Sequence, residues 1–234
     1  AEDGCKYIQL MKTHAVHIGR VAIGAGNPVA VQTMTDTDTN DIESTLGQIG
    51  RIYGRGCRIV RLTVQGMREA ESLRTISGRV RELYPGLAIV ADVHFLPAVA
   101  DTVAAFVDKV RINPGNYGDD MDRFRKLITI CRDNGTSIRI GVNHGSLPAS
   151  VVEAYGDTPE GMVELAMRFL RICREMDFDH AVVSMKSSNV RVMIAAYRLL
   201  AATMETEHMT YPLHLGVTEA GNGIDGRIKS VAGI

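Results

Sequence analysis

Residues 109–144, KVRINPGNYGDDMDRFRKLITICRDNGTSIRIGVNH, contain two short runs rich in β-branched residues on either side of an amphipathic segment. The runs cover residues 109–113 and 137–142, and their length is typical of buried strands. The segment between them, residues 121–134, ends in Asn134-Gly135, a typical helix stop. A strand, a helix and a second strand in this order predict a parallel pair joined by an outer crossover helix.

The same alternation extends along the chain in both directions. Strand-like runs occupy residues 29–34, 58–64, 87–93, 109–113, 137–142, 180–185 and 212–217, and helix-like segments occupy 41–55, 66–84, 121–134, 158–176, 189–202 and 223–231. About seven βα units predict an α/β fold, a TIM-type (β/α) barrel that lacks one unit of the usual eight. An open doubly wound sheet fits the same spacing. Residues 1–28 are predicted to form an N-terminal extension with a short hairpin, and residues 29–234 the barrel domain.

Composition narrows the class of partner. The 234 residues carry a formal net charge of −1, so no global basic field points to nucleic acid or to an anionic membrane. No apolar run approaches the roughly 20 residues of a membrane span, and the first residues lack the features of a signal peptide, which favours the cytosol. None of the four cysteines forms a Cys-x-x-Cys pair, so we expect free thiols and no metal site within this chain.

Four cationic residues stand near the ends of predicted strands at positions of equal parity. In IVRLT, VRIN, IRIGVN and SMKSS, the period of two along a strand directs Arg61, Arg111, Arg139 and Lys186 toward one space. Such a cluster is costly unless a multiply charged anion binds there, and the arginine forks suit phosphate. In the competing interpretation, each arginine pairs with a structural carboxylate such as Asp92 or Glu219.

Further polar residues occupy the same strand ends. Asp92 shares a face with His94, Asn113 follows Arg111, and Asn143 and His144 follow Arg139. His94 and His144 are candidates for acid–base chemistry or hydrogen bonding. Glu219 is interpreted either as a proton donor or as a charge-balancing partner of the cations.

The motifs VQTMT (residues 31–35), RINPGN (111–116), GVNHGSL (141–147), SMKSSNV (184–190) and HLGVTEAGNGIDGRIKS (214–230) resemble the 4-hydroxy-3-methylbut-2-en-1-yl diphosphate synthases of the non-mevalonate isoprenoid pathway. The resemblance covers nearly the whole chain, and GDTPEGMVE (156–164) is closer to the long form of that family. It implies a TIM-type barrel followed by a domain with a [4Fe–4S] cluster. The implied reaction is a two-electron reductive ring opening of 2-C-methyl-D-erythritol 2,4-cyclodiphosphate with loss of water, with electrons from flavodoxin or ferredoxin.

The resemblance also implies roles for individual residues. The diphosphate would meet Arg61, Arg111, Arg139 and Lys186. Asp92, His94, Asn113, Asn143 and His144 would complete the substrate site, and Glu219 matches a glutamate proposed in the family as an acid–base group.

In this resemblance the eighth strand and the cluster-binding cysteines fall beyond Ile234. We therefore expect this chain to bind no cluster and to be inactive alone in the redox step. Free sheet edges lead us to expect a homodimer. The alternatives are a phosphate-binding barrel of the pterin-binding, dihydropteroate synthase-like type and a non-catalytic dimerisation module. A plant or algal source would place the protein in a plastid instead of the cytoplasm.

Overall fold

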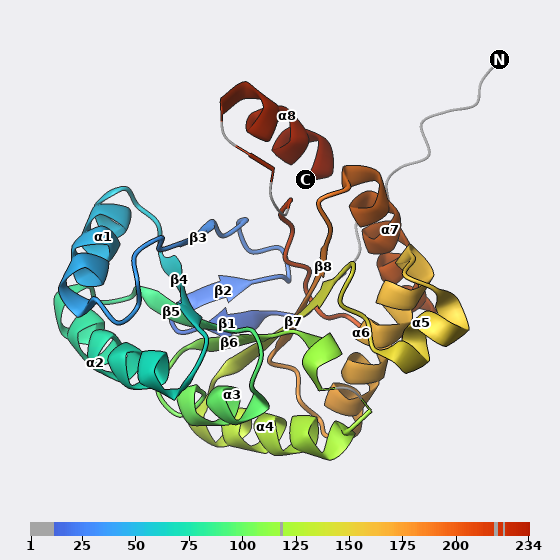
Figure 1. Ribbon diagram of the computed structural model, residues 1–234, viewed down its shortest axis with the longest axis horizontal. Coiled ribbons are helices and arrows are strands. Elements are labelled where there is room, and N and C mark those ends of the chain that lie inside the picture. Colours follow the sequence, from blue (N-terminus) through green and yellow to red (C-terminus); the bar gives the residue numbers. More distant parts are fainter. Residues whose placement is uncertain (1–11, 118, 218–219, 222) are drawn as a thin grey trace.

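The computed structural model describes residues 12–117, 119–217, 220–221 and 223–234. In this part of the chain, six parallel strands form one curled sheet, with helices along its outer face (Figure 1). The strands are β3 (Gln32–Met34), β4 (Ile59–Val64), β5 (Ala88–Val93), β6 (Lys109–Ile112), β7 (Ser137–Asn143) and β8 (Ala181–Lys186). Each strand pairs with the next one along the chain, without the reversal of strand order that a doubly wound sheet requires. The prediction of a TIM-type α/β barrel is confirmed, and the open-sheet alternative is wrong.

The helices of the described residues largely follow the sequence pattern. They are α1 (Ile42–Gly54), α2 (Met67–Leu83), α3 (Pro97–Val103), α4 (Met121–Asn134), α5 (Ala149–Tyr155), α6 (Pro159–Glu175), α7 (Val190–Thr206) and α8 (Gly223–Gly233), with a 3₁₀ turn at Pro114–Asn116. The helices α3 and α5 were not predicted, because seven residues are too few to show a helical period. None of these helices is both long and apolar enough to cross a bilayer.

Local signals fix where several helices begin and end. The side chains of Asp41 and Thr158 accept hydrogen bonds from the backbone N–H groups of Ser44 (3.1 Å) and Gly161 (3.3 Å), which caps α1 and α6. At the other end of α4, Gly135 adopts a left-handed conformation with φ of 67°, as the Asn-Gly stop predicts.

The prediction of a seventh strand over residues 212–217 is wrong. Among the described residues, this segment contributes a single parallel bridge, between Leu213 and Val183, with hydrogen bonds from Val183 N to Pro212 O (3.1 Å) and from His214 N to Val183 O (2.9 Å). In the described part of the chain, the segment pairs only with β8, and only its first residues, Pro212 to His214, take part in these hydrogen bonds. The predicted first strand is shortened for a similar reason. It pairs with β4 alone, and its residue Val31 is exposed.

Alternation along each strand separates an apolar outer layer from a polar interior. In β7, Ile138, Ile140 and Val142 are fully buried in the core beneath the helices. Arg139 and Gly141 lie at the opposite parity and face the interior of the curled sheet, since successive side chains alternate between faces. The hydrophobic core thus lies between sheet and helices, which leaves the interior free for charged groups.

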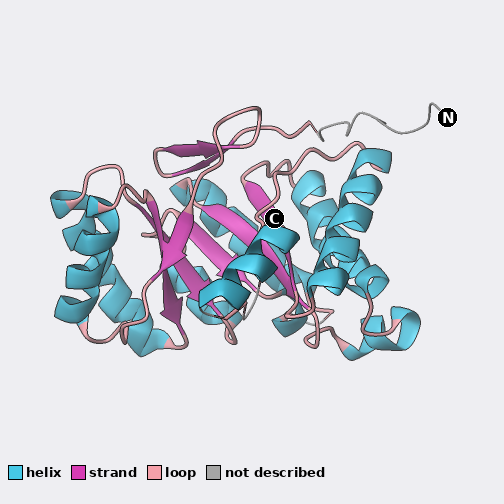
Figure 2. Ribbon diagram, turned by 90° about the horizontal axis from the view of Figure 1, so that it is seen from above, coloured by secondary structure: helices cyan, strands magenta, loops and turns pink. Residues whose placement is uncertain are grey.

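The predicted hairpin is present as β1 (Val16–Ile18) and β2 (Val21–Ile23), an antiparallel pair that lies across one end of the sheet (Figure 2). Ile18 is 1% exposed and belongs to a separate apolar cluster with Ile59, Ala88 and Val90. Ile59 and Ala88 are the first residues of their strands, so the hairpin covers the N-terminal ends. The polar interior therefore opens toward the C-terminal ends, where α/β sites lie.

Replacing Ile18 with alanine tests the contribution of this cap to stability. Because the side chain is fully buried against β4 and β5, we expect Ile18→Ala to lower the free energy of unfolding by about 2–4 kcal/mol. Urea denaturation followed by circular dichroism measures the change. Val29→Ala, at a side chain that is 95% exposed, is the matched control and should leave the midpoint in place. Equal midpoints for Ile18→Ala and the wild type would show that the hairpin does not contribute to the fold's stability.

Candidate anion-binding site

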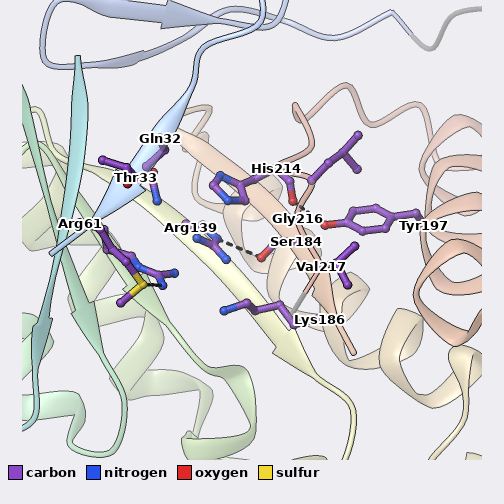
Figure 3. A pocket seen from close by; sticks show the side chains of 12 residues that line it. Gln32, Thr33, Arg61, Arg139, Ser184, Lys186, Tyr197, His214, Gly216 and Val217 are labelled. Atoms are coloured by element: carbon purple, nitrogen blue, oxygen red, sulfur yellow. Dashed lines mark hydrogen bonds between the residues drawn. The ribbon is translucent and has the colours of Figure 1, made fainter. Parts of the chain in front are cut away.

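A cavity of about 430 Å³ lies on the inner face of the sheet. Arg61 from β4, Arg139 from β7 and Lys186 from β8 point into it from different directions (Figure 3). The remaining lining residues come from β3, β8, α7 and the segment after Leu213: Gln32, Thr33, Met34, Ser184, Tyr197, His214, Leu215, Gly216 and Val217. Three of the four cations that parity predicted to converge thus line one cavity.

The fourth cation, Arg111, lies deeper, beside a buried carboxylate. Its Nη1 atom is 3.0 Å from Asp92 Oδ1, and its Nη2 atom donates to Asn143 Oδ1 at 2.9 Å. Both Arg111 and Asp92 are 1–2% exposed. Gly141 makes room for this guanidinium, because a Cβ atom at that position would lie 2.7 Å from Arg111 Nε.

Asp92 also contacts Arg61, whose Nε atom is 3.2 Å from Asp92 Oδ2 although its N–H is not aligned for a hydrogen bond. The structural-pairing interpretation therefore holds for Arg61 and Arg111. Among the described residues, no carboxylate lies within 4 Å of the charged atoms of Arg139 or Lys186. Glu219, the other carboxylate considered, lies outside the described residues.

Arg139 has a buried hydrogen-bond donor beside the cavity that the described residues do not engage. Its Nε atom donates to Ser184 Oγ at 3.0 Å, but its buried Nη1 atom has no hydrogen-bond partner in the described structure. Buried donors are nearly always satisfied in native proteins. A charged donor left over beside a cavity therefore points to an acceptor that binds there.

Burial and mutual repulsion shift the ionisation of these groups. Desolvation, followed by the charges of Arg139, Arg111 and Arg61, lowers the pKa of Lys186 to about 7. Desolvation and the neighbouring arginines lower the pKa of Arg139 to about 9. Burial alone would raise the pKa of Asp92, but the hydrogen bond with His94 and the charges of Arg111 and Arg61 lower it well below its usual range.

The structure adds two interior residues that sequence reasoning missed. Lys109 is 1% exposed and donates to Gln32 Oε1 at 2.9 Å across the interior. It stands two positions before Arg111, so the same parity rule that found Arg111 identifies it as inward-facing. His214, the first residue of the motif at 214–230, also lines the cavity. The sequence pattern predicted a strand there but did not indicate that the His214 side chain faces the interior.

The remaining predicted residues lie away from the main cavity. Asn113 donates to Ser146 Oγ at 2.9 Å, and His94 Nε2 is 3.3 Å from Asp92 Oδ2. Both line a smaller hollow formed by the loops after β5 and β6. His144 Nε2 is 3.8 Å from Asp157 and is not among the residues that line either space. The structure thus brings Asp92, Arg111 and Asn143 next to the cavity and leaves His144 at the periphery.

The iron–sulfur cluster implied by the resemblance does not fit the donors that the structure describes. Cys131 and Cys173 are fully buried, and burial raises the pKa of both thiols, which disfavours the thiolate form that a cluster needs. Cys57 donates to backbone carbonyls. Cys5 lies outside the described residues, and within them no three His, Cys, Asp or Glu side chains gather in a way that holds a metal ion.

Removing the charge of Asp92 should strongly destabilise the protein. Because Arg61 and Arg111 would lose their shared buried partner, we expect Asp92→Asn to cost about 3–5 kcal/mol of unfolding free energy. Since the folded pKa is depressed, this stabilisation is present above about pH 4 and is lost only as the pH falls through the lowered value.

Chemical denaturation at pH 7 measures the loss for Asp92→Asn. Glu71→Gln, which removes an exposed carboxylate 3.7 Å from Arg74, is the control and should leave the midpoint unchanged. If both substitutions had the same small effect, Asp92 would not compensate the buried arginines.

Known proteins resemble this chain in sequence over nearly its whole length. The model of the GcpE TIM-barrel domain matches residues 13–234, which includes the hairpin, so the boundary predicted at residue 28 stays a prediction. A 4-hydroxy-3-methylbut-2-en-1-yl diphosphate synthase (flavodoxin) of Bacteroides thetaiotaomicron is 49% identical over 95% of this chain. The ferredoxin enzyme of Picosynechococcus is 49% identical over 97%, and the chloroplastic ferredoxin enzyme of Arabidopsis thaliana 45% over 95%. The chain spans 40%, 61% and 33% of these relatives, respectively.

Solved structures share the fold at low identity. A type I 3-dehydroquinate dehydratase from Clostridium difficile aligns with 86% of this chain and 79% of its own, at a TM-score of 0.59 and 11% identity. A dihydropteroate synthase from Burkholderia cenocepacia aligns with 94% of this chain and 85% of its own, at 0.57 and 16%. At such identities these likenesses show the barrel fold alone. The sequence matches are specific, and by them this chain belongs to the GcpE TIM-barrel domain family.

Proposed function

We propose that this chain is the substrate-binding barrel of a 4-hydroxy-3-methylbut-2-en-1-yl diphosphate synthase and that its cavity binds 2-C-methyl-D-erythritol 2,4-cyclodiphosphate. The observation that carries the proposal is Arg139, a buried guanidinium whose Nη1 amino group has no hydrogen-bond partner among the described residues, beside a cavity shared with Arg61 and Lys186. Relatives that are 45–49% identical are named as diphosphate synthases, which supports the choice of a diphosphate ligand.

The sign of the ligand's charge is opposite to that of the interior. Five inward-facing basic side chains, Arg61, Lys109, Arg111, Arg139 and Lys186, accompany one carboxylate, Asp92, among the described residues of the strands. Burial and mutual repulsion lower the pKa values of Lys109, Arg139 and Lys186. In a cyclic diphosphate each phosphorus atom carries one ester and one bridging anhydride oxygen, so each phosphate has one negative charge. Two charges held between arginine forks and a lysine relieve the repulsion among the cations.

For the whole protein we propose the two-electron reductive opening of this ring, with loss of water. The names of the relatives specify flavodoxin or ferredoxin, and we propose one of these as the electron donor. In this proposal the described residues bind and orient the cyclic diphosphate, and none of them carries electrons. Glu219 as an acid–base group and a [4Fe–4S] cluster in the whole enzyme remain parts of the proposal.

The alternatives have less support. A pterin-binding barrel shares the fold with this chain, but the likeness to dihydropteroate synthase is limited to 16% identity, whereas the sequence matches point to the diphosphate synthases. A homodimer stays a prediction, supported by the exposed apolar residues Ile224, Ile228 and Val231 along α8. We propose a cytoplasmic location, or a plastid one in a plant or alga, since the Arabidopsis relative is named chloroplastic.

Titration calorimetry with the cyclic diphosphate tests the proposal directly. We expect the protein to bind it and Arg139→Gln to weaken binding by about 10- to 100-fold, because a charge-assisted hydrogen bond is lost. Arg68→Gln, at an exposed arginine outside the cavity, is the matched control and should keep the wild-type affinity. Absence of heat with the cyclic diphosphate, together with binding of a pterin, would reverse the assignment.

The affinity should depend on pH through Lys186. With a pKa of about 7, its ammonium group is mostly charged at pH 6 and mostly neutral at pH 8. The ligand's charge stays constant over this range because each of its phosphorus atoms carries one ester and one bridging anhydride oxygen, which leaves a single strongly acidic group on each. Since the anion favours the charged form, affinity should fall by about tenfold from pH 6 to pH 8.

Calorimetry at both pH values checks this dependence, with Lys186→Met as the comparison. The variant should bind more weakly at pH 6 and show a flat profile, because the titrating ammonium group is gone and Arg139, with a pKa of about 9, stays mostly charged up to pH 8. A steep profile that persisted in Lys186→Met would assign the titration to another group.

A further inference from the structure

The cavity has two chemically different kinds of lining residue. Arg61, Arg139 and Lys186 form its cationic part, and Gln32 and His214 line it with uncharged polar groups (Figure 3). Arginine and lysine offer only hydrogen-bond donors, whereas an amide and a neutral imidazole offer both donors and acceptors. The proposed function accounts for the cationic part and leaves the uncharged polar groups unexplained.

The direction of the Gln32 amide is set by a buried lysine. Lys109 Nζ donates to Gln32 Oε1 at 2.9 Å, so the amide oxygen faces Lys109. The NH₂ group of Gln32 must then point away from Lys109. Gln32 lines the cavity, which leaves this group available to a ligand.

His214 is held by its backbone and leaves its ring free in the described structure. Its N–H donates to Val183 O at 2.9 Å, and its carbonyl oxygen accepts from the hydroxyl of Tyr197. No hydrogen bond of the ring to a described residue occurs. Desolvation and the charges of Arg139, Lys109, Arg61 and Lys186 lower the pKa of His214, so the ring is neutral and keeps one acceptor nitrogen.

We propose that Gln32 and His214 recognise the hydroxyl-bearing, uncharged part of the ligand, and that Lys109 is the positioning residue that orients the Gln32 amide. This inference rests on the proposed function, because it assumes that a phosphate group occupies the cationic part. A hydroxyl group donates one hydrogen bond and accepts others, which fits an imidazole nitrogen beside an amide NH₂. The cationic part cannot accept the hydroxyl proton.

The identity of the ligand makes the inference testable. In a 2,4-cyclodiphosphate of an erythritol, the oxygens at positions 2 and 4 are esterified and those at positions 1 and 3 remain hydroxyls. Inorganic pyrophosphate has the same bridged phosphate pair with more negative charge and no such hydroxyls. The change that a substitution makes in the ratio of the two affinities, relative to the wild type at the same pH, therefore reports on recognition of the hydroxyl-bearing part.

The experiment measures both affinities by calorimetry at one pH for wild type, Gln32→Leu, His214→Leu and Lys109→Met. We expect Gln32→Leu and His214→Leu each to lose about tenfold in affinity for the cyclic diphosphate, because a buried polar partner is left unsatisfied, and to keep their affinity for pyrophosphate within about twofold. Lys109→Met also removes a basic group from the interior, so we expect it to weaken both ligands and the cyclic diphosphate by the larger factor. Retained pyrophosphate binding also shows that each variant folds. His180→Leu, at an exposed histidine outside the cavity, should keep both affinities.

Two results distinguish failure of this inference from failure of the proposed function. If the wild type binds neither ligand, the assignment of the anion site is wrong. If the wild type binds both and the three variants change both affinities by the same factor, or change neither, then Gln32, His214 and Lys109 do not discriminate between the ligands and the inference is overturned.

Discussion

The carboxylate of Asp92 is the constraint around which the interior is arranged. It is almost fully buried, and it contacts two arginines that approach from β4 and β6, the strands on either side of its own. Isolated charges are too costly to bury in an apolar interior, so Arg61 and Arg111 can lie inside the curled sheet only because this acid is there. Arg139, Lys186 and Lys109 have no comparable partner among the described residues. Burial lowers the pKa values of these three groups, which reduces their mutual repulsion in part. The positive charge that remains attracts an anion.

The fold tolerates this interior because its main hydrophobic core is elsewhere. Outward residues of each strand pack beneath the helices, and this layer contains most of the buried apolar side chains. The interior needs only a small apolar cluster at the hairpin end. The outward residues of each strand therefore stabilise the fold, and the inward residues at alternate positions form the anion site. Arg111 illustrates the division, since both its sequence neighbours, Val110 and Ile112, belong to the core.

Much of this arrangement could be predicted from the sequence, since it depends on local periodicity. The period of two placed Arg61, Arg111, Arg139 and Lys186 on the inner face, and the helix boundaries followed from caps such as Asp41 and Thr158. Contacts between distant residues could not be predicted in this way. Nothing local indicates that Lys109 reaches Gln32, 77 positions away, or that Asp92 takes two of the arginines and leaves Arg139 without a carboxylate. The seventh strand was overestimated because sequence pattern measures a segment's tendency to extend, and not whether neighbours exist on both sides.

The hairpin across the N-terminal strand ends directs the electric field of the buried cations toward the C-terminal strand ends. Apolar side chains of low polarisability, among them Ile18 and Val90, fill the end that it covers, while the polar cavity lies beyond them. This wall of low dielectric constant focuses the field of the buried cations toward the solvent-filled end of the cavity. An anion in solution therefore experiences attraction chiefly from the side of the C-terminal ends. The rate at which the site binds an anion should therefore fall as ionic strength rises, because salt screens this attraction at the C-terminal end.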